Sequence, residues 1–156
     1  MSLATDSIFI TALQSNSELL EALGYDEQTG ENARLYGTAI PLPDEDLDNV
    51  PVPYVIVTFD GLTNDQDTKD DRYESEYDRV NIGIEVVGKT LEDLHGLTQM
   101  VRDTILSYLC ENDTAIMDYS FAAQQIQYDS LKPCYWQVLT YQCDVNNTND
   151  DEQDEE

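Results

Sequence analysis

The residues that come nearest to a known chemical motif are the acids of a polar segment in the middle of the chain. Asp65, Asp67 and Asp71 alternate with Lys69, in the spacing that oxygen ligands have in a calcium-binding loop. An EF-hand needs a third alternate oxygen ligand, then a glycine, and a glutamate at the end of the loop. Lys69 and Asp70 occupy the first two of these places. The segment is therefore interpreted as a solvated acidic loop, and no metal or other cofactor is expected.

The other residues that could do chemistry are a single histidine and three cysteines. His95 has no cysteine, serine or carboxylate partner that the sequence identifies, which favours a structural role. Cys110, Cys134 and Cys143 are odd in number and lack CxxC spacing, so we expect buried thiols in a reducing compartment and no disulfide framework or zinc site. A nucleophile elbow, a P-loop and a dinucleotide fingerprint are all missing from the sequence. We do not expect an enzyme.

The charge of the chain is extreme. Its 156 residues include 33 acids and 7 bases, for a formal net charge of −26. Only seven of the acids lie from Asp144 onward, so most of the charge belongs to the folded part of the chain. Such a surface repels nucleic acid and anionic membranes, and we expect no specific binding to either. The sequence shows neither a signal peptide nor an apolar run that could span a bilayer, so an intracellular protein is expected.

The elements that position these residues are clearest in the centre of the chain. In YDRVNIGIEVVG, residues 77–88, Val80, Ile82, Ile84 and Val86 alternate with other residues, which predicts a strand with one buried face. Across a short turn the apolar spacing changes to three and four residues, which predicts an amphipathic helix over 91–109. The face of this helix contains Leu91, Leu94, Leu97 or Thr98, Val101, Ile105, and Tyr108 or Leu109. Thr90 and Asp93 resemble a capping box at its start.

The remaining elements follow from shorter patterns. Residues 5–23 are predicted to be helical, with a break at 14–17 where Ser15 or Ser17 caps a second short helix, and Gly24 ends it. A weak strand is expected at 33–40, and a strand covered on both faces at 54–59. Residues 61–76 and 111–118 are predicted to be loops, and 121–128 and 135–145 strands joined by a turn. In the last strand Tyr135, Gln137, Leu139, Tyr141, Cys143 and Val145 share one face, opposite Trp136 and Val138.

The elements together predict an α+β fold. We expect a mainly antiparallel sheet of about five strands with two main helices packed on it, in the order α-β-β-β-α-β-β. Residues 1–145 should form a single domain, and residues 146–156, which contain no apolar side chain, should form a disordered acidic tail.

The order of these segments resembles the phage and prophage tail-completion family, which includes tail terminators and U-like minor tail proteins. The resemblance covers residues 7–145. It rests on the N-terminal SIFITALQSNSELLEALG, the short RLY, the PYVIV strand, the segment RVNIGIEVVGKTLEDLHGLTQMVRDTIL, and the closing YWQVLTYQCDV. PYVIV together with the strand and helix that follow is the most telling part. The acidic tail and the extreme charge are departures from the family pattern.

The resemblance implies a structural protein, and neither a catalytic site nor a cofactor. Members form rings, typically of six copies, that cap the tail tube and help join it to the head. The implied partners are other copies of the chain, the tail tube protein and the head-completion protein, in the bacterial cytoplasm during assembly and in the virion afterwards. We expect the loop at 61–76 to reach a neighbour, through Asp65, Asp67, Asp70, Asp71, Arg72 and Tyr73.

Two other interpretations remain open on the sequence alone. An acidic DNA mimic would bind the basic groove of a DNA-binding protein, and it would account for the net charge of −26 more directly. It would leave the tail-protein-like order of elements unexplained. The other alternative is an acidic α+β domain whose partner the sequence does not identify.

Overall fold

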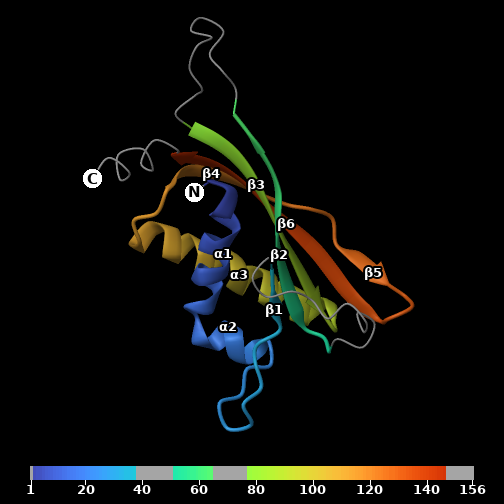
Figure 1. Cartoon of the computed structure of the whole chain (residues 1–156). Helices are drawn as coiled ribbons and strands as arrows, with labels where there is room; N and C mark the ends of the chain where they lie inside the picture. Colours follow the sequence, from blue (N-terminus) through green and yellow to red (C-terminus); the bar gives the residue numbers. More distant parts are fainter. Residues whose placement is uncertain (1, 38–50, 65–76, 147–156) are drawn as a thin grey trace, which may run out of the picture.

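The computed structural model describes residues 2–37, 51–64 and 77–146 (Figure 1). It confirms the α+β fold, with the predicted order of main elements. The elements are a 3-10 turn at Ser2–Ala4, α1 Thr5–Gln14, α2 Ser17–Ala22, β1 Leu35–Tyr36, β2 Tyr54–Thr63, β3 Tyr77–Gly88, α3 Leu91–Glu111, β4 Ile116–Ala123, β5 Gln127–Asp129 and β6 Cys134–Asn146. Within these ranges, no helix has both the length and the apolarity needed to cross a bilayer.

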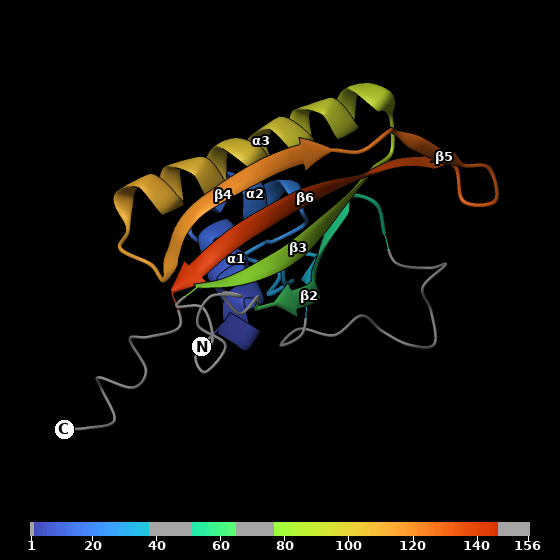
Figure 2. The same ribbon diagram turned by 90° about the horizontal axis from the view of Figure 1, so that it is seen from above.

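The strands form one sheet in the order β1-β2-β3-β6-β4, with β5 paired to β6. Every pairing is antiparallel except that of β1 with β2. The sheet has six strands where the sequence predicted about five, because the predicted strand 121–128 is divided between β4 and β5. The helices lie on one face of the sheet, with α1 and α3 packed directly against it (Figures 1 and 2).

The core lies between that face and the helices. The strands contribute alternate residues that are completely buried, such as Ile84 of β3 and Leu139 of β6, which are neighbours in the sheet. The helices contribute Phe9 and Leu13 from α1 and Leu94, Val101 and Ile105 from α3. Burial of each such side chain is worth roughly 1.5–3 kcal/mol, so this face supplies most of the stabilisation of the fold.

The turn between β3 and α3 brings the helix close to the strand. Thr90 caps the helix as predicted: its Oγ1 accepts a hydrogen bond from the N–H of Asp93 at 3.0 Å. A Cβ on Gly88 would lie 2.9 Å from the backbone of Leu94. The close approach of the helix therefore requires glycine at this position.

At the N-terminus the predicted break is confirmed, but the predicted caps are wrong. α1 ends at Gln14 and α2 begins at Ser17, and the cap of α2 is Asn16. Asn16 has extended backbone angles, which aim its side chain back at the first free N–H groups of α2. Gly24, with φ +100°, follows the end of α2 as predicted.

The predicted bounds were wrong at two strands. β4 begins at Ile116, inside the predicted loop 111–118, and ends at Ala123; β5 is a separate strand. A register shift between Ile116 and Asp118 breaks the alternation that would have indicated this strand. β2 likewise continues past a bulge to Thr63, into the predicted loop 61–76.

Three predictions of burial were also wrong. β2 is not covered on both faces, because Val55 and Val57 are buried whereas Thr58 on the other face is exposed. Cys110 is exposed on α3, while Cys134 and Cys143 are buried. Leu91 at the first turn of α3 is 44% exposed, since the helix starts beyond the end of β3.

Candidate interaction surfaces

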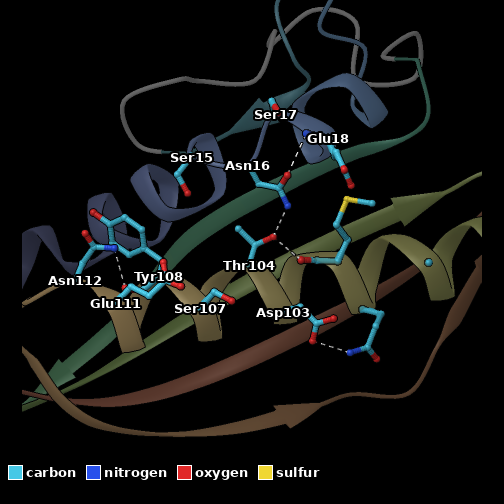
Figure 3. Close-up of a pocket in the computed structure, with 13 residues that line it drawn as sticks. Ser15, Asn16, Ser17, Glu18, Asp103, Thr104, Ser107, Tyr108, Glu111 and Asn112 are labelled. Atoms are coloured by element: carbon cyan, nitrogen blue, oxygen red, sulfur yellow. Dashed lines mark hydrogen bonds between the residues drawn. The ribbon is translucent and has the colours of Figure 1, made fainter.

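A polar groove lies where the junction of α1 and α2 faces α3 (Figure 3). Asn16 Oδ1 accepts hydrogen bonds from the N–H groups of Glu18 and Leu19, at 3.0 and 3.3 Å. Asn16 Nδ2 donates to Thr104 Oγ1 at 2.8 Å, and the Thr104 hydroxyl donates to the Met100 carbonyl at 2.6 Å. A single side chain therefore starts α2 and ties both N-terminal helices to α3.

The charged residues that line this groove are all acids. They are Glu18, Asp103 and Glu111, and Asp103 accepts a hydrogen bond from Gln99 Nε2 at 2.8 Å. The hollow has a volume of about 930 Å³ and is open to solvent. Its other lining residues are Ser15, Asn16, Ser17, Gly96, Met100, Thr104, Ser107, Tyr108 and Asn112. Such a lining is complementary to cationic or hydrogen-bond-donating groups and unsuited to phosphate.

The second surface is the sheet face that points away from the helices. We name it the outer patch, and it consists of two rows of cross-strand neighbours from β2, β3 and β6: Tyr54, Val87 and Trp136, then Ile56, Glu85 and Val138. All of them are half-buried except Val87, which is buried. The outer patch is therefore mostly apolar and contains one carboxyl group.

The surroundings of the outer patch affect its titratable groups. Burial raises the pKa of Glu85 above its ordinary value. Burial, followed by the nearby charge of Glu85, also raises the pKa of Tyr54. Lys132 Nζ lies 5.4 Å from the centre of the Tyr54 ring, at the margin of the patch. Contact with a partner that excluded more water would favour the neutral form of Glu85 further.

An aromatic cluster on the helix side contains the one buried side-chain oxygen without a hydrogen-bond partner in the described residues. The ring of Tyr141 packs 5.1 Å from Phe9, 5.7 Å from Tyr119 and 5.1 Å from Phe121, measured between ring centres. Burial raises the pKa of the Tyr141 hydroxyl far above its ordinary value, so the phenol remains protonated. This cluster contributes packing, since a phenol with a raised pKa is a weak acid that remains un-ionised.

The buried cysteines are equally unreactive. Burial raises the pKa of Cys143 to about 12, and burial also raises that of Cys134, so the nucleophilic thiolate is scarce at both.

His95 is exposed on α3. Among residues 2–37, 51–64 and 77–146, no three His, Cys, Asp or Glu side chains are grouped so that they could hold a metal ion.

The interface residues predicted from the sequence lie outside the described residues. These are Asp65, Asp67, Asp70, Asp71, Arg72 and Tyr73. The strands on either side of this range pair with each other, with Thr63 opposite Arg79, so these two residues lie at the same end of the sheet. The groove was not predicted from the sequence. The polar run at 14–17 was its signal, but Thr104 lies 88 residues further along the chain.

Comparison with known proteins gives a fold relationship. No protein-family model and no curated protein sequence matches the chain. Among solved structures, a chain from the virion of the native gene transfer agent (GTA) particle aligns with a TM-score of 0.55 and 11% identity, over 91% of this chain and 94% of that chain. The shared feature is the fold. The structure of bacteriophage SPP1 gp17 protein aligns with a TM-score of 0.46 and 18% identity, over 94% of this chain and 91% of that chain.

Proposed function

We propose that this protein is a structural tail-completion subunit of a phage or prophage, either a tail terminator or a head–tail joining protein. The observation that carries the proposal is the fold shared with a chain of the GTA virion, which extends over 91% of this chain. The order and spacing of the sequence segments, which resemble the tail-completion family, support it independently. On this proposal the chain has no catalytic role, and it resides at the tail end or neck of the virion after assembly in the bacterial cytoplasm.

The proposed assembly is a ring of six copies that caps the tail tube. A subunit of such a ring contacts its two neighbours through different surfaces, and it also needs surfaces for the proteins above and below. The polar groove and the outer patch lie on opposite sides of the sheet, so they are able to contact different molecules at the same time. We assign them to two different partners in the virion, the tail tube protein and the head-completion protein.

The acidity also fits this role. With 33 acids and 7 bases, like-charge repulsion would keep DNA from adhering to a bore lined by this chain. The same repulsion opposes contact between copies, and we expect it to hold the chain monomeric at low ionic strength. The segment with Asp65, Asp67, Asp70, Asp71, Arg72 and Tyr73 is proposed to reach a neighbouring subunit or the tail tube.

The deciding experiment measures particle mass and shape with and without the tail tube protein encoded in the same genome. Light scattering and negative-stain imaging at about 0.05 M and about 0.5 M NaCl test the effect of screening. We expect rings at the higher salt, or on the tail tube protein. A chain that stays monomeric in every condition, but forms a stoichiometric complex with a basic DNA-binding protein that DNA displaces, would contradict the proposal and favour DNA mimicry.

A further inference from the structure

Within the described residues, the sheet ends on each side in an edge that is at least partly unpaired. At one end, the single partner of β4 among these residues is β6. At the other end, β1 pairs with β2 only at Val55 and Ile56. Over residues 58–63 the described part of the chain provides β2 with β3 as its single partner strand. An edge of unpaired N–H and C=O groups is a template for pairing with another strand.

The backbone of β4 presents such groups outward. The N–H of Gln124, just past the strand, donates to the Val138 carbonyl of β6 at 2.9 Å. Hydrogen bonds on one side of an antiparallel strand involve alternate residues, so the N–H and C=O groups of Ala123 and Phe121 point away from β6. Among the described residues, no backbone group outside the sheet pairing forms a hydrogen bond with the N–H or C=O groups of Ala123 and Phe121.

The backbone N–H of Tyr119 supports the outward direction of these groups. The N–H of Tyr119, two residues before Phe121, donates to its neighbouring Asp118 carboxylate at 2.9 Å and not to β6. Within β4 itself, Met117 at the bulge is 55% exposed. Natural edge strands are commonly protected by lysine or proline, and β4, with the sequence IMDYSFAA, contains neither.

The two edges also carry matching side chains. On the helix side of the sheet, Tyr119 and Phe121 of β4 pack against the core but are only partly buried, and so are Phe59 and Leu62 of β2. These side chains form the incomplete ends of one apolar layer. Bringing the two edges together would complete the burial of both pairs, which favours association.

Strand direction decides how the edges would meet. Because β2, β3, β6 and β4 are each antiparallel to the next, β2 and β4 run in opposite directions. Rotation about an axis roughly parallel to the strands preserves their direction. In a ring of this kind, β4 of one copy would thus meet β2 of the next copy as an antiparallel pair, in a head-to-tail contact that closes.

We infer that β4 of each copy pairs antiparallel with residues 58–63 of β2 in the next copy, so that one continuous sheet runs around the ring. This inference rests on the proposed function, since it specifies how the ring closes. It identifies the partner of the free edges as a second copy of this chain.

Cysteine cross-linking tests the pairing. In a Cys110→Ser background, Ser120→Cys on β4 is combined with Thr58→Cys or Thr63→Cys on β2, all exposed and on the same sheet face. Within one chain these strands are about 14 Å apart, three strand spacings, so a disulfide forms only between copies. We expect oxidised rings to give a ladder of covalent oligomers. Ser120→Cys with the exposed Glu27→Cys is the control, and it should give no ladder.

A backbone variant tests the hydrogen bonds of the edge. Ala123→Pro removes an N–H that points away from β6, so the pairing inside the subunit is retained while an edge donor is lost. We expect at least a tenfold loss of ring formation with a thermal midpoint close to that of the control Ala123→Ser. Normal rings from Ala123→Pro, or wild-type rings without the cross-link ladder, would overturn the inference and leave the proposed function standing. A wild-type chain that forms no ring in any condition would count against both.

Discussion

The two faces of the sheet are made by the same strands, yet they are buried to different extents. On the helix side of β3, Ile82, Ile84 and Val86 are completely buried, whereas on its other side Glu85 is half-buried. Trp136 and Val138 of β6 are half-buried beside it. Between the two edges of the sheet, the helix side buries its apolar residues inside one subunit, while the outer patch keeps apolar area that a neighbour can still cover. This division suits a subunit that folds alone and then assembles.

The largest expected effect comes from removing the same two methyl groups on each face. Val86→Ala deletes them where the side chain is completely buried, and Val138→Ala does so in the half-buried outer patch. We expect Val86→Ala to lower the free energy of unfolding by about 2–3 kcal/mol, and Val138→Ala by less than about 1 kcal/mol. Urea denaturation of the two variants measures the difference.

Thermal unfolding provides a second readout of the same pair. The loss at Val86 corresponds to a midpoint lower by roughly 5–10 °C in a domain of this size. Equal losses for Val86→Ala and Val138→Ala would show that the outer patch is as closely packed as the core. In that case the distinction between the two faces would be wrong.

The alternation of apolar residues predicted the helix side of the sheet correctly, because burial on that side depends only on the local alternation of side chains. Val80 to Val86 in β3 and Leu139 to Val145 in β6 were placed on the core face by that alternation alone. The start of β4 was missed, since its register is set by pairing with β6, more than 20 residues further along the chain. The bulge at Met117 removes the local signal for the strand.

Sites formed by distant residues were predictable only in part. The sequence indicated a break before Ser17, but the bond between Asn16 and Thr104 depends on how α1 packs against α3. Trp136 and Val138 were assigned to their face correctly, because the period of β6 fixes it. Tyr54 of β2 lies next to them in the outer patch because of the order of the strands in the sheet, and local sequence patterns do not reveal this order.

A smaller effect is expected from the carboxyl of the outer patch. Burial raises the folded-state pKa of Glu85 above its unfolded value, so the folded chain binds this proton more tightly than the unfolded chain. Glu85 therefore destabilises the fold above its folded pKa, and this penalty disappears as the pH falls through that value. Glu85→Gln should be more stable than wild type at about pH 7, with the advantage shrinking toward about pH 4.

The comparison is made by thermal unfolding of both proteins over that pH range. Glu27→Gln, at an exposed loop position, changes the net charge by the same amount and serves as the control. It should show little advantage at either pH. An equal advantage for both variants would attribute the effect to overall charge and not to the outer patch.

The smallest effect is expected on the helix side of the sheet, at the Tyr141 hydroxyl, the one buried side-chain oxygen without a hydrogen-bond partner in the described residues. Tyr141→Phe removes that hydroxyl and keeps the ring contacts with Phe9 and Phe121. Because the hydroxyl loses its hydration on folding and gains no protein partner, its removal should be neutral or stabilise the fold by up to about 1 kcal/mol. Tyr119→Phe, which alters a half-buried ring of the same cluster, is the control. A decrease of more than about 1 kcal/mol in the free energy of unfolding for Tyr141→Phe would mean that the hydroxyl has a partner such as a buried water. The helix side would then be less completely apolar than its burial suggests.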